Sequence, residues 1–348
     1  MQFDGADHGG SQARQTGRCL AILIPTYRRP KQLGRALSSI FDSHSEVDLS
    51  RIQVIVGEDG SGSPWDDEYN ALWRQFGSRC TVFRNEYNLG MAENLLSLAH
   101  HAVSPYSMVL TDDDTLIPGM LPDVLALVER AGALGAGLIA LPRLHVGEDG
   151  VKRGRSATVF HSGRVRPSGT NALRLTPRAH ILTGLVLRTD KIVNPCWSWA
   201  INNAYFPMAI QYYAVRDSGA IFSSRRVVNH TIDNETHWHR WGSNRDEQSR
   251  RLYCDKSNML ESLTRETLQW AESRREKIQV QWIRKALHIY YISAVHLNNS
   301  SFDYQTYRAS ESKCGGSGRP ISRAMFTVAT CASRMLQRLA PLARKLVL

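Results

Sequence analysis

The stretch Ser107-Met-Val-Leu-Thr-Asp-Asp-Asp114 places three adjacent carboxylates directly after a short apolar run. Like charges at this spacing repel one another and raise each other's pKa. A folded protein tolerates them when a cation lies among them, and carboxylate oxygens suit Mg2+ or Mn2+. If the apolar run is a strand of an open α/β sheet, its carboxyl end is also where such sheets bind ligands. For the tripeptide alone, a solvated acidic turn is the alternative interpretation.

Two further apolar runs have the same form. Residues 19–24 are continuously apolar and end at Pro25. Residues 52–56 are rich in β-branched side chains and lead into Glu58-Asp-Gly-Ser61. Both runs predict buried parallel strands. A helix is predicted after the first run, and another opens within Asn88-Leu-Gly-Met-Ala-Glu-Asn94. Strands and helices alternate, with polar residues where each strand ends, which predicts a mostly parallel α/β sheet flanked by helices.

Four motifs follow one another along the first third of the chain. They are Ile24-Pro-Thr-Tyr-Arg28, Glu58-Asp-Gly-Ser61, Asn88-Leu-Gly-Met-Ala-Glu-Asn94 and Asp112-Asp-Asp114. Together they resemble the inverting family 2 glycosyltransferases of the GT-A fold, which is Rossmann-like. The resemblance is specific over residues 19–120, looser to about residue 242 and absent beyond. The third motif followed by three Asp is most similar to the abequosyltransferase-like branch, whose members add sugars to lipid-linked O-antigen repeat units.

The resemblance implies a nucleotide-diphospho-sugar donor and a divalent cation, Mg2+ or Mn2+. A cation can neutralise the diphosphate as the nucleotide leaves. The implied metal ligands are Asp114, Asp112 and His230, with His237 and His239 as competing histidines. The implied donor pocket comprises Pro25, Thr26, Tyr27, Arg28, Asp59, Asn88, Gly90, Asn94, Asp112 and Asp113. Within it, Asp59 would accept a hydrogen bond from the nucleotide base, and for the basic turn at Arg28 a solvated loop is the alternative.

One group expected from the resemblance is missing. An inverting transfer needs a base that takes the proton of the acceptor hydroxyl. Many family members carry an adjacent Glu-Asp pair on a helix before the glycine that aligns near Gly219, and this chain has Tyr205-Phe-Pro-Met208 there. Asp233 and Glu235 are the candidate bases, and Asp217, in a predicted surface turn, is the third choice.

The chain has 348 residues, 42% of them hydrophobic and 22% charged, which supports one large domain with an appendage. The predicted segments are a disordered tail over 1–17, a GT-A-like domain that binds nucleotide-sugar and acceptor over 18–255, a helical extension over 256–308, a linker over 309–320 and a basic amphipathic tail over 321–348. The first segment lacks a signal-peptide core, no run reaches roughly 18 apolar residues, and the six cysteines are scattered. We therefore expect a cytoplasmic location.

The net charge of +11 fits nucleic acid, an anionic membrane or anionic substrates as partners. The sequence contains no nucleic-acid-binding motif. Residues 321–348 mix Arg and Lys with apolar residues and contain no acidic residue, which favours an anionic membrane surface over packing on the main domain. We expect an inverting glycosyltransferase that acts on a saccharide acceptor, lipid-linked, at the inner face of the cell membrane. The alternatives are a sugar nucleotidyltransferase and a non-catalytic nucleotide-sugar-binding scaffold.

Overall fold

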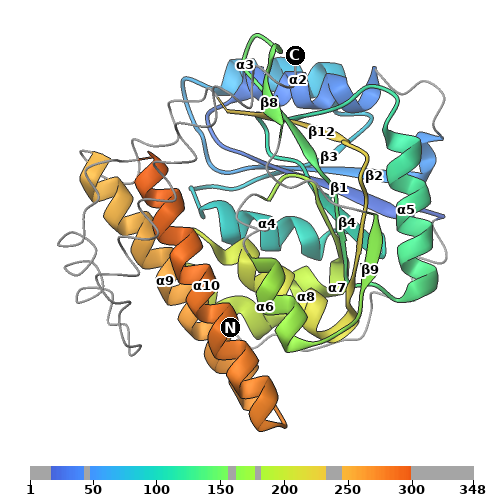
Figure 1. The fold of residues 1–348 in the computed structure, drawn as a ribbon. Helices are drawn as coiled ribbons and strands as arrows, with labels where there is room; N and C mark the ends of the chain where they lie inside the picture. Colours follow the sequence, from blue (N-terminus) through green and yellow to red (C-terminus); the bar gives the residue numbers. More distant parts are fainter. Residues whose placement is uncertain (1–16, 43–47, 156–161, 177–181, 233–244, 299–348) are drawn as a thin grey trace.

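A computed structural model describes residues 17–42, 48–155, 162–176, 182–232 and 245–298 (Figure 1). The strands of the main sheet are β1 (Leu20–Thr26), β2 (Ile52–Glu58), β3 (Thr81–Arg84), β4 (Tyr106–Val109), β6 (Leu138–Ala140), β9 (Gly163–Val165), β10 (Leu185–Arg188) and β11 (Ala220–Phe222). They form one eight-stranded sheet in the order β3-β2-β1-β4-β10-β6-β11-β9.

The main sheet is mostly parallel, which confirms the predicted fold class. β1 pairs in parallel with β2 and β4, β2 with β3, and β6 with β11. β10 runs antiparallel to β4 and β6, and β9 antiparallel to β11. Leu20 is in register with both Ile52 and Tyr106. The carboxyl ends of β1, β2 and β4 therefore meet at one edge, and the polar residues that follow these strands share it.

A smaller sheet starts where the Asp tripeptide ends. It has the order β5-β12-β7-β8 and consists of β5 (Thr115–Leu116), β7 (Arg143–Val146), β8 (Lys152–Arg155) and β12 (Val228–Thr231). β12 pairs antiparallel with β5 and parallel with β7. This pairing brings His230 to Asp112-Asp-Asp114 although more than a hundred residues separate them in sequence.

Helices cover both faces of the main sheet. They are α2 (Pro30–Phe41), α3 (Asp66–Phe76), α4 (Met91–His100), α5 (Leu121–Leu134), α6 (Gly169–Leu175), α7 (Thr189–Val193), α8 (Phe206–Ser218), α9 (Arg245–Trp270) and α10 (Arg274–Asn298). Alternate side chains of β1 enter two cores, as the strand repeat requires. Leu20 and Ile22 pack with α2, α3 and α5, whereas Ala21 and Leu23 pack in the core that contains α4 and α8.

The helical C-terminal part packs on the α4 and α8 face. Figure 1 shows α9 and α10 side by side, and Met259, Leu263 and Val280 are buried in the same core as α8. The hydroxyls of Tyr212 and Thr267 lie 2.8 Å apart across the contact. The predicted start of a helical extension at residue 256 falls inside α9. No helix among the described residues has the length and apolar character needed to cross a membrane.

Several predicted features lie outside the described residues. These are Asp233, Glu235, His237, His239, the linker over 309–320 and the tail over 321–348. Among the described cysteines, Cys19, Cys80 and Cys196 are free and Cys254 is disulfide-bonded. The expected cytoplasmic location stays a prediction.

Gly57 on β2 sets how closely α4 approaches the sheet. A Cβ at this position would lie 2.9 Å from Leu98 Cδ2 and closer still to Asn94 Oδ1. We expect Gly57→Ala to lower the free energy of unfolding by about 1–3 kcal/mol, because the packed side chains of Asn94 and Leu98 must shift. Gly132→Ala on α5 is the matched control, since its nearest neighbour would be Tyr106 Cε2 at 4.0 Å. Urea unfolding of both variants is the measurement, and equal stability of Gly57→Ala and wild type would contradict the close packing.

Candidate functional site

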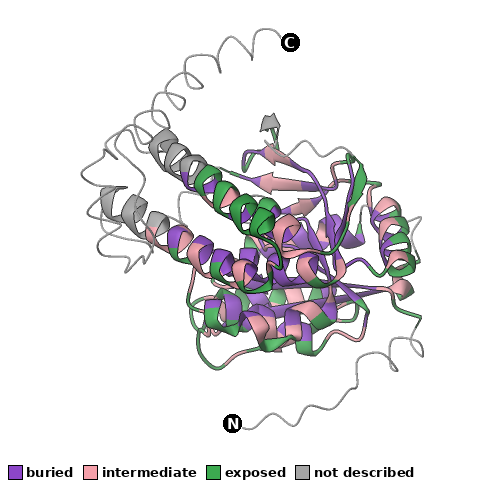
Figure 2. Ribbon diagram, turned by 60° about the horizontal axis from the view of Figure 1, so that its bottom comes forward, coloured by how far each residue is buried: buried purple, intermediate pink, exposed green. Residues whose placement is uncertain are grey.

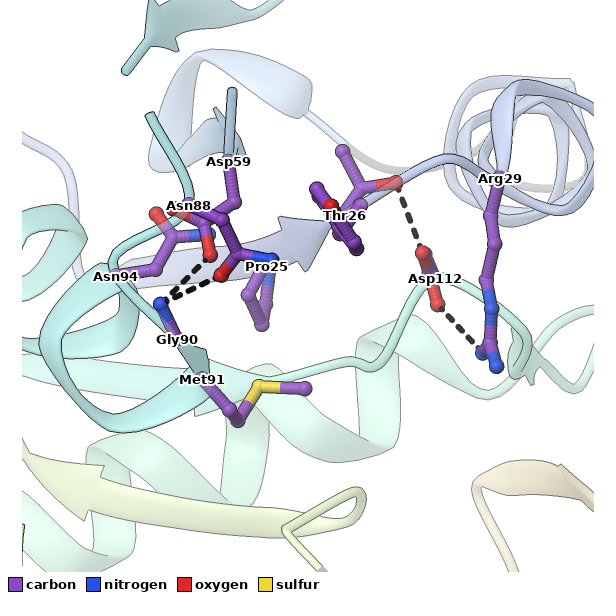
Figure 3. A pocket seen from close by; sticks show the side chains of 10 residues that line it. Pro25, Thr26, Arg29, Asp59, Asn88, Gly90, Met91, Asn94 and Asp112 are labelled. Atoms are coloured by element: carbon purple, nitrogen blue, oxygen red, sulfur yellow. Dashed lines mark hydrogen bonds and ion pairs between the residues drawn. The ribbon is translucent and has the colours of Figure 1, made fainter. Parts of the chain in front are cut away.

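A pocket opens at the carboxyl edge of β1 and β2, beside the loop that follows β4 (Figure 3). It is lined by Pro25, Thr26, Tyr27, Arg29, Asp59, Asn88, Gly90, Met91, Asn94 and Asp112. The structure thus brings together the residues predicted for the donor pocket except Arg28 and Asp113. Arg29 and Met91 line the pocket without having been predicted. Parallel pairing explains the gathering, because the contributing segments all follow strand ends or open a helix there.

Asp59 organises one side of the pocket. Its Oδ1 accepts hydrogen bonds from the Asn85 side-chain amide and the Leu89 N–H, both at 2.9 Å. Its Oδ2 accepts the Gly90 N–H at 3.0 Å, and Asn88 Oδ1 accepts the same N–H at 2.9 Å. The φ of Gly90 is +89°, a conformation that side chains disfavour, so glycine suits this position. Asp59 therefore fixes the loop that leads into α4 while it lines the pocket.

Two further side chains hold the same loops. Asn94 on α4 donates from its amide to the Gly57 carbonyl at 3.0 Å. Glu58 is buried, accepts the Ser61 N–H at 2.6 Å and lies 3.3 Å from Arg84 Nε. Its side chain therefore closes the turn after β2.

Asp112 is held from β1. The Thr26 hydroxyl donates to Asp112 Oδ2 at 2.8 Å. Because that hydroxyl has a single proton, Tyr69 Oη must be the donor in its 3.1 Å contact with Thr26. Tyr69 Oη also accepts the Arg29 N–H at 3.1 Å, and burial raises the pKa of this tyrosine. The phenol therefore stays protonated and fixes the chain after β1 against the Asp tripeptide.

Arg29 joins the first two carboxylates of the tripeptide. Its Nη1 lies 3.0 Å from Asp113 Oδ2 and 3.4 Å from Asp112 Oδ1. Figure 3 shows Arg29 and Asp112 on the opposite side of the pocket from Asp59. Arg28, by contrast, does not line the pocket. Its guanidinium lies 4.8 Å from the centre of the Tyr27 ring, and its N–H donates to Ser61 Oγ at 2.9 Å.

Asp114 faces the interior and does not line the pocket. Its Oδ1 accepts the Thr231 N–H at 2.8 Å, and its Oδ2 accepts the Thr111 hydroxyl at 2.6 Å. His230 Nδ1 lies 3.1 Å from both oxygens. The structure thus brings two of the predicted metal ligands, Asp114 and His230, into contact, and protein donors occupy both oxygens of Asp114.

Basic groups surround Asp114. Burial lowers the pKa of Arg143 to about 10, against the opposing effect of nearby Asp114, so its guanidinium is still charged at neutral pH. Arg143 Nη1 donates to the Thr183 carbonyl at 2.9 Å. Burial, followed by the neighbouring His230 and Arg143, lowers the pKa of His145 and favours its neutral form. Asp114 is thus hydrogen-bonded to β12 and lies near the basic side chains of β7.

No group of three or more His, Cys, Asp or Glu side chains within the described parts of the chain is arranged to hold a metal. Asp112 and Asp113 still fit one. They are adjacent, mostly buried and both in contact with the Arg29 guanidinium. Mg2+ commonly takes one or two carboxylates and completes its shell with phosphate oxygens and water. The donor chemistry of this pair therefore fits a divalent cation that arrives with a phosphate ligand.

The residues that sequence reasoning missed had weak signals. Met91 stands inside the third motif, but an apolar residue at a helix start is usually counted as core. Arg29 stands in a basic turn, where a solvated side chain is the ordinary reading. Its pairing with Asp113 depends on two segments more than eighty residues apart in sequence, which periodicity does not reveal.

Single replacements of Asp114 and Asp113 should distinguish an effect on stability from an effect on metal binding. Asp114→Asn removes the charge from a fully buried hydrogen-bonded cluster, so we expect a loss of about 1–3 kcal/mol in the free energy of unfolding. Asp113→Asn should change stability less and weaken binding of Mn2+. Urea unfolding and titration with Mn2+ measure the two effects. Full stability of Asp114→Asn combined with lost Mn2+ binding would restore Asp114 as a metal ligand.

Comparison with known proteins agrees with this geometry. Residues 21–182 match the family model for glycosyl transferase family 2. A protein of Haemophilus influenzae described as an uncharacterized glycosyltransferase is 29% identical over 111 residues, which are 32% of this chain and 35% of that protein. The chain thus spans about a third of the length of this curated relative.

Solved structures of low sequence identity share the fold. S. aureus TarS, residues 1–349 in complex with UDP-GlcNAc, has a TM-score of 0.57 at 12% identity, with 85% of this chain and 80% of that chain covered. The mannosyltransferase PcManGT from Pyrobaculum calidifontis, in complex with GDP-Man and Mn2+, has a TM-score of 0.51 at 11% identity, with 91% and 80% covered. Residues 21–182 are thus similar to glycosyl transferase family 2, and the chain shares the α/β fold of these solved structures.

Proposed function

We propose that the protein transfers a sugar from a nucleotide-diphospho-sugar to a hydroxyl group of a saccharide acceptor. The observation that carries the proposal is the pocket itself, which joins Asp59 and Asp112 within the matched family domain. The two structural neighbours, one with UDP-GlcNAc and one with GDP-Man, support a donor of this class.

The two sides of the pocket suit the two ends of a nucleotide-diphosphate. Asp59, Asn88 and Asn94 offer carboxylate and amide groups that can pair with a nucleotide base, and Tyr27 adds an aromatic ring. Asp112 and Arg29, on the other side, suit the ribose hydroxyls and the diphosphate. Pro25, Thr26 and Gly90 complete the wall with little steric bulk.

Metal dependence is part of the proposal, with Asp112 and Asp113 as the protein ligands of Mg2+ or Mn2+. Bound there, the cation would supply charge neutralisation for the leaving diphosphate. The Mn2+ recorded with the mannosyltransferase neighbour supports this choice of ion. Asp114 takes no ligand role, because its carboxylate is enclosed by Thr111, Thr231 and His230.

The proposed transfer proceeds with inversion. The acceptor oxygen forms a bond to the anomeric carbon, the bond from that carbon to the diphosphate breaks, and the hydroxyl proton passes to a base. Asp233 and Glu235 are the proposed bases, since their segment directly follows β12, where Thr231 contacts Asp113 and Asp114. Asp217 is a poorer choice. Although burial would raise its pKa, hydrogen bonds from Arg216 and Lys191 lower it, and Asp217 precedes β11 at the opposite edge of the sheet.

The acceptor is proposed to be a lipid-linked saccharide at an anionic membrane, similar to the O-antigen intermediates of the abequosyltransferase-like branch. The described part of the chain adds a supporting surface on α10. Figure 2 shows exposed residues along α10, and Trp282 is 68% exposed beside Ile278. Lys277 and Lys285 lie on the same face. Exposed Trp among basic residues suits a membrane interface.

A donor screen tests the proposed function. We expect one sugar among UDP-, GDP-, CDP- and dTDP-sugars to raise the melting temperature in the presence of Mn2+, since a ligand at 100 times its Kd stabilises by about 2.7 kcal/mol. Asp112→Asn should lose this effect, whereas Glu129→Gln on α5 serves as the control. Asp233→Asn or Glu235→Gln should keep donor binding and lose transfer. Binding without hydrolysis or transfer would favour the scaffold alternative, and the absence of any donor would contradict the proposal.

Vesicle sedimentation tests the membrane proposal. Each basic side chain near an anionic surface is worth about 1 kcal/mol. We therefore expect reversal of Lys277 and Lys285 to Glu to weaken binding to anionic vesicles at least tenfold at low salt. Removal of residues 321–348 should weaken it as well. The matched control reverses Arg74 on α3 and Arg130 on α5. Equal sedimentation of all these proteins would contradict the proposal.

A further inference from the structure

Arg29 is a cation that already lies on the candidate metal ligands. Its guanidinium contacts Asp113 at 3.0 Å and Asp112 at 3.4 Å. All three side chains are largely buried, with exposures of 13% for Arg29, 7% for Asp112 and 8% for Asp113. A buried pair of carboxylates without a cation is costly. Neutralisation by Arg29 therefore contributes to the stability of the ligand-free protein.

We propose that Arg29 is an internal counter-ion that a divalent cation must displace from Asp112 and Asp113. A guanidinium and a metal ion need the same carboxylate oxygens, so full binding of one excludes full binding of the other. The free protein should therefore bind Mn2+ weakly. Removal of the guanidinium should strengthen Mn2+ binding, because it removes a cation that competes for the same carboxylate oxygens.

The backbone of Arg29 is fixed while its side chain is long. Its N–H donates to Tyr69 Oη at 3.1 Å, and its carbonyl accepts the Leu33 N–H at 3.0 Å in the first turn of α2. Displacement thus requires only rotation of the side chain, with no movement of α2 or β1. The same guanidinium lines the pocket with Asp112, so it remains beside the ligand after it leaves the carboxylates.

A displaced guanidinium has a second anionic partner if the protein binds a nucleotide-diphospho-sugar. Guanidinium groups bind phosphate oxygens in a bidentate manner. Exchange of Arg29 from the carboxylates to the diphosphate would then couple binding of metal and donor. This step rests on the proposed function, whereas the competition between Arg29 and a metal ion concerns the free protein alone.

The test is Mn2+ binding without nucleotide, followed through the EPR signal of unbound Mn2+. We expect Arg29→Gln to bind Mn2+ at least tenfold more tightly than wild type. Arg35→Gln is the matched control, because Arg35 is an exposed arginine of α2, the helix that Arg29 precedes, and it donates to the Glu148 carbonyl. Adding Asp113→Asn to Arg29→Gln should remove the gain. Equal affinity of Arg29→Gln and wild type would overturn the proposal.

Thermal melting provides a readout that does not depend on affinity measurements. In EDTA, Arg29→Gln should melt below wild type, and Mn2+ should raise its melting temperature more than that of wild type. If Arg29→Gln does not fold, Arg29→Lys keeps the charge without the planar fork and should show an intermediate response. Equal shifts in wild type and in the folded variant would overturn the proposal. Because no nucleotide is present, this failure would leave the proposed transfer standing, and a failed donor screen would leave the competition standing.

Discussion

The neutralisation of Asp112, Asp113 and Asp114 is the constraint on which the site depends. Three consecutive carboxylates at the end of a buried strand would repel one another. A different part of the fold stabilises each carboxylate. Thr26 donates a hydrogen bond to Asp112, Arg29 pairs with Asp113, and β12 encloses Asp114. The cluster thereby ties together β1, the start of α2 and the smaller sheet.

The three carboxylates of the tripeptide therefore have different surroundings. Asp114 is enclosed and has its hydrogen-bond partners within the protein, so it belongs to the framework. Asp112 lines the pocket, and Asp113 shares Arg29 with it, so these two can exchange partners. The tripeptide therefore combines one enclosed carboxylate, Asp114, with a pair, Asp112 and Asp113, that we propose as metal ligands. The difference arises from the turn after β4, which points successive side chains in different directions.

Local sequence patterns were sufficient to predict the carboxyl edge of the sheet and most of the residues that line the pocket. The apolar runs at residues 19–24 and 52–56 correspond to β1 and β2, and Asn88-Leu-Gly-Met-Ala-Glu-Asn94 opens α4. Parallel pairing then brings their ends together without further information. The partners of Asp114 and Arg29 were not predictable in this way, because those contacts join segments far apart in sequence. The resemblance suggested that Asp114 is a metal ligand. Burial of its carboxylate by β12 disfavours this role.

The helical C-terminal part illustrates a second limit of sequence reasoning. Helical spacing predicted helices after residue 256, but not that Met259, Leu260 and Leu263 complete the core beneath α8. The boundary predicted at residue 256 thus falls inside α9, which begins at Arg245.

A crystal structure with Mn2+ and the nucleoside diphosphate of the best donor would show directly whether the metal ion binds Asp112 and Asp113 and displaces Arg29. The account predicts that the nucleotide lies between Asp59 and Asp112, that the metal ion binds Asp112 and Asp113, and that Arg29 has moved to the diphosphate. Asp114 should keep its hydrogen bonds to Thr111 and Thr231. A nucleotide bound elsewhere, or a metal ion bound by Asp114 with Arg29 still on Asp113, would contradict the account.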